Sequence, residues 1–202
     1  MITLYDNDVS GNAYKVRLFL ALLRLPYTRK AVDLFKGEGR TPAFLALNVL
    51  GQVPVLVDDD VTLRDSHGIL TYLALRYGGG QWISSEPAVM ARVAAWMSNS
   101  ANELQNGPGA ARLVHTFKIG SDLKRPKAIA ARIFGAMEAQ LRATPWLVGA
   151  EPMIADIACF PYTMLAPEGD ISLEEFPAIR RWMGQIETLP GFVPMVGGCR
   201  PE

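Results

Sequence analysis

A chain of 202 residues can form one large domain or two small ones, and half of these residues are hydrophobic. The 20 basic and 20 acidic side chains give a formal net charge of zero, which argues against a nucleic-acid partner. No uncharged apolar run is long enough to span a bilayer, and we expect the first residues to form a strand rather than a signal peptide. These properties favour a globular protein without nucleic-acid or membrane partners.

Cysteine and histidine are both rare in this chain. Cys159 and Cys199 lie far apart and form neither a CxxC pair nor a disulfide framework, so we expect a reducing, cytoplasmic compartment. His67 and His115 are also isolated, and ligands scattered in this way do not predict a metal site. Cys159 is expected to be a small core residue, and Cys199 to lie in an irregular tail.

The first half alternates between strand and helix patterns. Apolar residues recur with period two in the predicted strands and at helical spacing between them. In chain order we expect a strand at 2–5, a helix at 13–24, a strand at 27–32, a short helix from Thr41 and Pro42, hairpin strands at 55–57 and 61–63, and a helix from Ser66. This β-α-β-α-β-β-α order predicts a mixed four-stranded sheet with helices on both faces.

The segment at 51–70 contains two backbone features that suit a ligand. Pro54 opens the first hairpin strand, where proline is tolerated because its missing N–H is not needed by the ladder. Ser66 is a good N-cap, and free N–H groups at a helix start attract a carboxylate. Asp65 could accept hydrogen bonds from an ammonium, so the pair suits an amino-acid head group. The alternative is that Asp65 and Ser66 only cap the helix.

The second half shows only helical patterns. Glycines at 78–80 interrupt the chain and read as a linker, so we expect domains at 1–78 and 86–202. The expected helices begin near Val89 and end at 106–109, run through 129–141, cover an apolar segment at 154–162, and begin again at Pro177. Two halves of unlike class predict a cleft between them, where small-molecule sites tend to form.

Four motifs in register resemble the soluble glutathione transferases, and most closely their bacterial theta-, zeta- and nu-like serine or asparagine types. The motifs are SGNAYKVR at 10–17, NVLGQVPVL at 48–56, DSHGIL at 65–70 and IADI at 154–157. The resemblance implies a thioredoxin-like domain followed by an all-helical one, glutathione as co-substrate without a further cofactor, and a homodimer. Two departures are Val49, where the family usually has proline, and Met153, which leaves Asp156 with half of a capping box.

The resemblance assigns six residues to glutathione binding: Arg40, Gln52, Val53, Pro54, Asp65 and Ser66. In the family the Val–Pro bond is cis, and the valine backbone pairs with the cysteinyl part of glutathione like an added strand. The acid–serine pair holds the γ-glutamyl group. Gln52 and Arg40 could reach the glycyl carboxylate or the cysteinyl backbone, although Arg40 also fits a solvated surface charge.

The family's chemistry takes place at the start of the first helix. Ser10 lies where family members place a serine whose hydroxyl donates to the glutathione sulfur, and where glutaredoxin-like relatives carry a cysteine. Asn12 is the rival, because related disulfide-reducing proteins use an asparagine in the thiol contact; otherwise Asn12 caps the helix. Because no cysteine occupies this position, sulfur chemistry here would use the ligand's own thiol.

An acceptor pocket is harder to define from the sequence, because scattered side chains line such pockets. Trp96, Asn99, Tyr162 and Leu165 are candidates, and packing in the helical core is the alternative for Trp96 and Leu165. Three functions remain open: a transferase acting on a small electrophile, a glutathione-dependent disulfide or peroxide reductase, and a non-catalytic interaction module.

Overall fold

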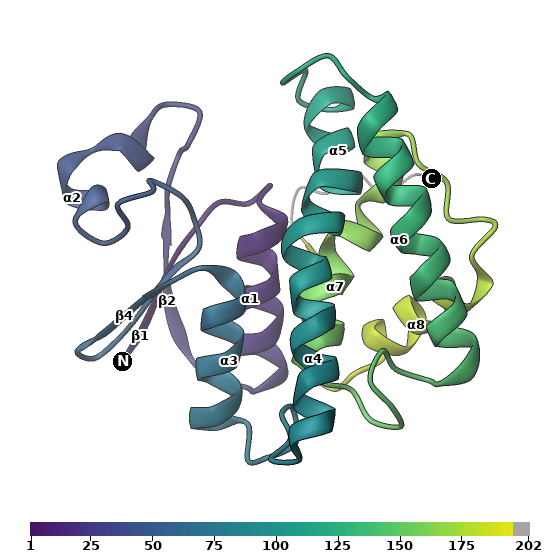
Figure 1. The fold of residues 1–202 in the computed structure, drawn as a ribbon. Helices are drawn as coiled ribbons and strands as arrows, with labels where there is room; N and C mark the ends of the chain where they lie inside the picture. Colours follow the sequence, from purple (N-terminus) through teal and green to yellow (C-terminus); the bar gives the residue numbers. More distant parts are fainter. Residues whose placement is uncertain (196–202) are drawn as a thin grey trace.

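The computed structural model describes residues 1–195, so Cys199 lies outside the described part. The first half folds as predicted, with helix and strand alternating up to a terminal hairpin (Figure 1). Its elements are β1 (Ile2–Asp6), α1 (Gly11–Leu22), β2 (Tyr27–Ala31), the 3-10 turn η1 (Glu38–Arg40), α2 (Pro42–Leu45), β3 (Val55–Asp58), β4 (Val61–Arg64) and α3 (Ser66–Tyr77).

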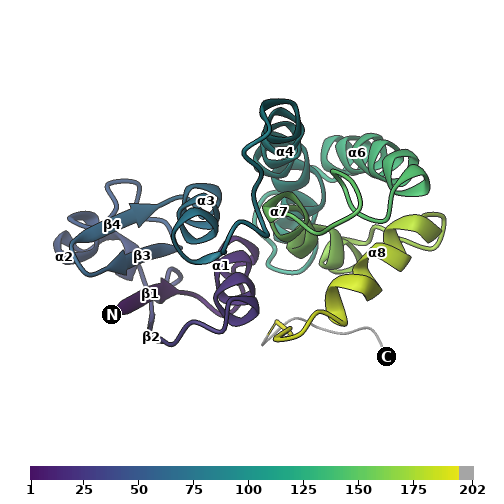
Figure 2. The same ribbon diagram turned by 90° about the horizontal axis from the view of Figure 1, so that it is seen from below.

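The four strands form a mixed sheet in the order β2-β1-β3-β4. β1 runs parallel to β2, with Ile2 opposite Tyr27, and antiparallel to β3, which continues through the hairpin into β4. Figure 2 shows α1 and α3 between the sheet and the helical half, with α2 on the other side of the sheet. This confirms the predicted fold, and it places the start of α1 where the two halves of the molecule meet.

The regular elements of the second half are all helices within the described residues. Its elements are α4 (Pro87–Asn99), the π-helical segment η2 (Ser100–Gly109), α5 (Ala110–His115), α6 (Lys124–Ala143), α7 (Ile154–Met164), the 3-10 turn η3 (Ala166–Gly169) and α8 (Pro177–Glu187). Apolar side chains of α6, α7 and α8 form one continuous core with those of α1 and α3. None of the described helices combines the length and the apolar character that a membrane span needs.

The prediction that a helix ends at 106–109 is wrong. The chain instead continues from α4 through the π-helical η2 directly into α5. A Cβ on Gly107 would come within 3.0 Å of the Ala130 backbone nitrogen in α6, and one on Gly109 within 3.1 Å of the Tyr162 ring. These glycines therefore permit close packing of η2 against α6 and α7, rather than ending the helix.

Asp156, the acid predicted inside an apolar helix, is fully buried at the start of α7. Its Oδ1 accepts hydrogen bonds from the Leu147 amide (3.0 Å) and from Trp182 Nε1 (2.8 Å). Its Oδ2 accepts one from the Met153 amide (2.9 Å), which is the expected half of a capping box. Burial raises the pKa of Asp156 to about 6, against the hydrogen bonds that favour the carboxylate. One carboxylate thus joins α7, the segment before it, and α8.

Replacing this carboxylate is expected to destabilise the whole second half. In Asp156→Ala two buried N–H groups and one partly buried N–H group lose their acceptor, which costs roughly 3 kcal/mol of unfolding free energy. Chemical denaturation measures this loss. The exposed Glu151 provides the control, because Glu151→Ala should change stability by no more than about 0.5 kcal/mol. Equal stability of the two variants would contradict the role given to Asp156.

Candidate functional site

A buried ion network fixes the loop that leads from β1 into α1. Asp6, at the end of β1, accepts hydrogen bonds from Arg17 Nη1 at 2.8 and 2.7 Å and from Arg29 Nε at 2.5 Å. Arg17 also donates to the Asn7 and Asp8 carbonyls (3.3 and 3.1 Å). Because Asp6 is fully buried, solvent screens these bonds poorly, and they fix the positions of β1, α1 and β2 relative to one another.

Helix α1 begins at Gly11, two residues before the start that its apolar pattern predicted. Ser10 is its N-cap, since Ser10 Oγ accepts a hydrogen bond from the Ala13 amide at 3.2 Å. The alternative that Asn12 caps the helix is therefore wrong, because Asn12 lies in the first helical turn. The Ser10 hydroxyl keeps its hydrogen for another acceptor, because as a cap it only accepts.

A small polar recess lies beside this first turn. Its volume is about 70 Å³, and it is lined by Asn12, Asn48, Leu50, Gln52, Val53, Pro54, Arg64, Asp65 and Ser66. The Val53–Pro54 peptide is cis, as the resemblance implied. The fold thus brings five of the six residues assigned to glutathione binding together with Asn12. Arg40 does not line the recess; it is exposed in η1.

The start of α3 forms one wall of the recess. The N-cap is Asp65 rather than Ser66, because Asp65 Oδ1 accepts hydrogen bonds from the His67 and Gly68 amides at 2.9 and 3.0 Å. Asp65 has a positive φ of 72°, and its side chain is 63% exposed. Ser66 is the first helical residue and is buried. The carboxylate can therefore cap the helix and still face a ligand.

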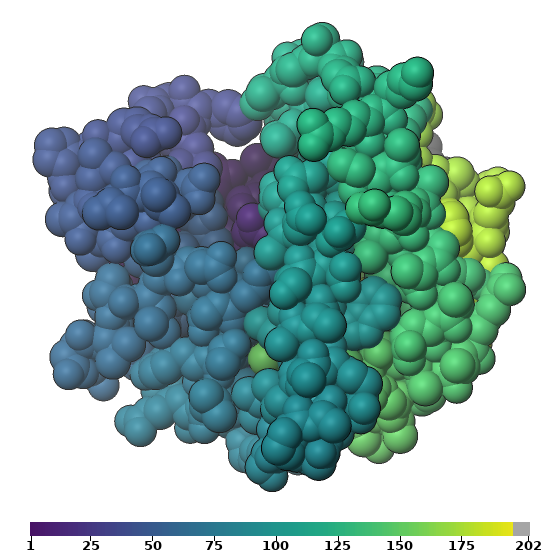
Figure 3. Space-filling model, viewed as in Figure 1, coloured from purple at the N-terminus to yellow at the C-terminus, as the bar shows by residue number. Residues whose placement is uncertain are grey.

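A larger, mostly apolar cavity of about 340 Å³ opens on the other side of the α1 start. Its lining comes from both halves of the chain: Asn7, Val9, Ser10, Gly11, Leu34, Phe35, Gln105, Gly109, Arg112, Leu113, Phe117, Ile119 and Tyr162. In Figure 3 the hollow separates the N-terminal half from α5, with purple N-terminal residues on its floor. Phe35 and Phe117 stack across the two halves with ring centroids 6.1 Å apart.

The predicted acceptor residues are divided between this cavity and the protein core. Tyr162 lines the cavity, whereas Trp96 and Asn99 are not among its lining residues. Trp96 packs against the helical core, and Asn99 Nδ2 donates to Glu103 Oε2 at 3.1 Å. Leu165 is a buried core residue, which confirms the alternative that it packs in the helical core.

Sequence reasoning missed Gln105, which connects the recess with the cavity. Asn12 Nδ2 donates to Gln105 Oε1 at 3.0 Å, although the two residues are 93 positions apart. Burial raises the pKa of the Tyr162 phenol, opposed by the side chain of Gln105 and the backbone N–H of Asn12. The only available signal was the polar run that interrupts the helical pattern before Gln105, and it does not indicate a partner.

Arg112, also missed, anchors the cavity wall. Its Nε donates to Glu168 Oε2 at 2.5 Å and its Nη1 to the Val9 carbonyl at 2.6 Å, and both charged side chains are buried. The guanidinium also lies 4.9 Å from the centre of the Phe117 ring. The Arg112 side chain thus ties α5 to η3 through an ion pair and to the loop before α1 through a hydrogen bond. Since the charge of Arg112 is already paired, the cavity offers mainly apolar contacts.

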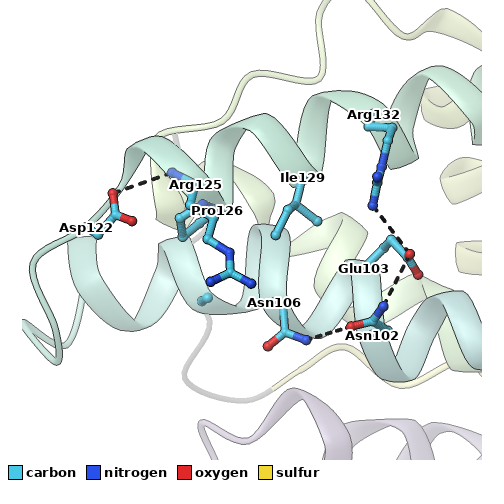
Figure 4. Close-up of a pocket in the computed structure, with 9 residues that line it drawn as sticks. Asn102, Glu103, Asn106, Asp122, Arg125, Pro126, Ile129 and Arg132 are labelled. Carbon is cyan, nitrogen blue, oxygen red and sulfur yellow. Dashed lines mark hydrogen bonds and ion pairs between the residues drawn. The ribbon is translucent and has the colours of Figure 1, made fainter.

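A third hollow is a polar pocket of about 430 Å³ between η2 and α6 (Figure 4). Arg132 lies 3.5 Å from Glu103, and Asn106 donates to Asn102 at 3.0 Å, so its polar groups largely bond to one another. None of the predicted site residues lines it. Among residues 1–195, no group of three or more His, Cys, Asp or Glu side chains is placed to hold a metal ion.

The Arg112–Glu168 pair generates a stability prediction. Arg112→Met leaves a buried carboxylate without its partner, which typically costs roughly 3–5 kcal/mol. Arg132→Met is the matched control, because Arg132 is exposed and its ion pair with Glu103 is worth at most about 1 kcal/mol. Urea denaturation of both variants measures the difference. Similar unfolding midpoints and slopes for the two variants would refute the anchoring role of Arg112.

Comparisons with known proteins agree with this architecture. A family model described as the N-terminal domain of glutathione S-transferase matches residues 9–76, and one for the C-terminal domain matches 113–190. The chain is 32% identical over 199 residues to glutathione S-transferase GstB of Escherichia coli strain K12, covering 94% of this chain and 95% of that protein. It is 30% identical to the disulfide-bond oxidoreductase YfcG of the same strain, covering 94% and 92% of the two chains.

Solved structures give the same result. The crystal structure of a glutathione S-transferase from Pseudomonas fluorescens Pf-5 superimposes with a TM-score of 0.90. The two sequences are 36% identical, and the match covers 96% of this chain and 98% of the other. The similarity therefore extends over both halves of the molecule.

Proposed function

Because this chain belongs to the glutathione S-transferase family, we propose that it binds glutathione in the polar recess and transfers it to a small electrophile in the adjacent cavity. One observation carries the proposal. The first turn of α1 separates a polar recess, which contains Val53, Asp65 and Ser66, from a mostly apolar cavity. A thiol at this turn would face the cavity while the rest of glutathione lies along the recess.

The recess offers a suitable group for each part of the ligand. Because Asp65 already accepts from the His67 and Gly68 amides, the Ser66 amide and the positive end of α3 attract the γ-glutamyl carboxylate. The exposed Asp65 carboxylate accepts from the ligand ammonium. The backbone of Val53 pairs with the cysteinyl part, and Gln52 lies beside it for the glycyl end. Arg40 remains a candidate for the glycyl carboxylate only if its side chain moves toward the recess, since it does not line it.

Activation of the thiol requires a donor that stays protonated at neutral pH. Ser10 meets this requirement, because its oxygen accepts from the Ala13 amide while its hydrogen can donate to sulfur. The positive end of α1 adds to the preference for the thiolate. Asn12 has a second amide hydrogen besides the one bonded to Gln105, so it is the competing donor. We propose that Ser10 donates to the reacting sulfur.

Reduction of disulfides or peroxides by glutathione is the second candidate. It is favoured by the position of Asn12, which lines the recess while Ser10 lines the cavity, and by the similarity to YfcG. In that reaction the bound thiolate would attack a disulfide sulfur in the cavity and release the other sulfur as a thiol. A purely structural module is disfavoured, because it would not need the residues of the recess.

We further propose that the protein is a cytoplasmic homodimer. The exposed apolar side chains of Val49 and Leu75 lie outside the recess and the cavity, and they suit a protein interface better than solvent. Size-exclusion chromatography with light scattering should give twice the 22.1 kDa mass of one chain. A monomer at micromolar concentration would remove the dimer from the proposal.

Glutathione binding should depend on the charge of Asp65. Asp65→Asn keeps an oxygen that can cap α3 but leaves the ligand ammonium without a carboxylate, costing roughly 1–3 kcal/mol of binding free energy. Isothermal titration calorimetry with glutathione measures the loss. Asp122→Asn is a matched control, since Asp122 also accepts from a helix-start amide but lies far along the chain. Unchanged affinity in Asp65→Asn would exclude this residue from the binding site.

The thiol donor can be identified by titrating the ultraviolet absorbance of the bound thiolate. Ser10→Ala should raise the pKa of the bound thiol and slow turnover by roughly ten- to a hundred-fold, the equivalent of a charged hydrogen bond of about 1.5–3 kcal/mol. Glutathione affinity should change little. Thr41→Ala controls for a lost helix cap, because Thr41 caps α2 in the same way. If only Asn12→Ala shifts the curve, the disulfide-reducing function becomes the better proposal.

A further inference from the structure

Lys15 is a completely buried charge that the proposed reaction does not use. It lies on α1, its side chain is fully shielded from solvent, and its Nζ approaches Ser100 Oγ at 3.0 Å and His67 Nε2 at 3.1 Å. Among the ion pairs of the described residues none includes Lys15. A buried ammonium is ordinarily paired with a carboxylate, because neutral acceptors compensate little of its lost hydration.

The hydrogen bonds around Lys15 determine where the protons lie. Ser100 Oγ donates its own hydrogen to the Ala158 carbonyl at 2.6 Å, so it accepts from the ammonium. His67 Nε2 accepts in the same way, which leaves the ring hydrogen of neutral His67 on Nδ1. His67 Nδ1 is 4.0 Å from Asp65 Oδ1. A chain of contacts therefore runs from the buried ammonium through His67 to the carboxylate at the recess.

The titratable groups that face Lys15 are consistent with this proton arrangement. Burial lowers the pKa of Lys15 to about 8, and burial together with the neighbouring ammonium lowers the pKa of His67 to about 4. Cys159 on α7 also faces Lys15, but burial raises the pKa of its thiol, which keeps it neutral. The Tyr162 ring lies 5.5 Å from the ammonium. At neutral pH the cluster therefore holds one positive charge, and Asp65 is the negative group nearest along the chain of contacts.

We propose that Lys15 is a positioning residue for glutathione, whose buried charge strengthens the hold of the α3 start on the γ-glutamyl carboxylate. This inference rests on the proposed binding of glutathione in the recess. Ser66, which begins α3, is adjacent to His67, so an anion bound there supplies a counter-charge to Lys15, which no ion pair of the described residues includes. Lys15 itself does not touch the ligand.

The coupling can be measured in the wild-type protein by nuclear magnetic resonance. The ε-carbon signal of Lys15 in ¹³C-lysine-labelled protein is followed against pH, with and without S-methylglutathione. The sulfur of S-methylglutathione is methylated, so the ligand has no thiol whose titration would overlap with that of Lys15. An anion at the α3 start should raise the pKa of Lys15 by about one unit, the equivalent of ten-fold coupling. An unchanged Lys15 titration at saturating ligand would overturn the inference.

Lys15→Met tests the same idea by affinity. Methionine removes an uncompensated buried charge while keeping a long apolar side chain, so the variant should fold and melt no lower than wild type. Its affinity for S-methylglutathione at pH 7 should fall about ten-fold, and the ¹⁵N signals of His67 should report loss of the single Nδ1–H tautomer. Lys30→Met, which removes an exposed lysine in β2, should leave both unchanged.

The two failures are distinguishable. If wild-type protein does not bind S-methylglutathione, the proposed function itself is wrong. If wild type binds it but Lys15→Met binds equally well and keeps the His67 tautomer, only the role of Lys15 is refuted. Should the variant fail to fold, the wild-type titration decides alone.

Discussion

The close approach of α1 to α7 is the constraint on which the rest of the site depends. A Cβ on Gly11 would lie 2.9 Å from the Tyr162 ring, so only glycine allows the first turn of α1 to come this near. This contact places Ser10 and Asn12 between the recess and the cavity. Any side chain at Gly11 would push Tyr162 into the cavity or move α1, and either change would separate the groups that must act together.

Electrostatic interactions within the fold are mostly internal and paired. Asp6, Arg112 and Asp156 are each buried, and each is hydrogen-bonded to neighbouring groups or paired with an opposite charge. They hold the loop before α1, the cavity wall and the start of α7. Lys15 differs from them, because its hydrogen-bond partners Ser100 and His67 are neutral. A net charge of zero therefore conceals one buried positive charge close to the proposed anion site.

The proposed transferase and reductase functions use the same glutathione-binding site and differ only in the group that contacts the glutathione sulfur. Both need glutathione in the recess, and both need a cavity that excludes water from the thiolate. The cavity wall is apolar and joins side chains of both halves, such as Phe35 and Phe117, so it suits a hydrophobic acceptor of either kind. What separates the readings is whether Ser10 or Asn12 contacts the sulfur, a difference of one half-turn at the start of α1.

The sequence by itself determined the order of elements, the mixed sheet and the recess, because each has a local signal. Hydrophobic periodicity and turn residues predict the elements and the sheet, and the Val53–Pro54 and Asp65–Ser66 pairs predict the recess. Even the helix caps were recognised to within two residues. Only the tertiary structure decided that η2 continues into α5, that Gln105 meets Asn12, and that Lys15 lies behind the recess. The contacts of Gln105 and Lys15 join residues tens of positions apart. A glycine in a helical pattern can either end the helix or permit close packing against another helix. No local pattern distinguishes the two cases.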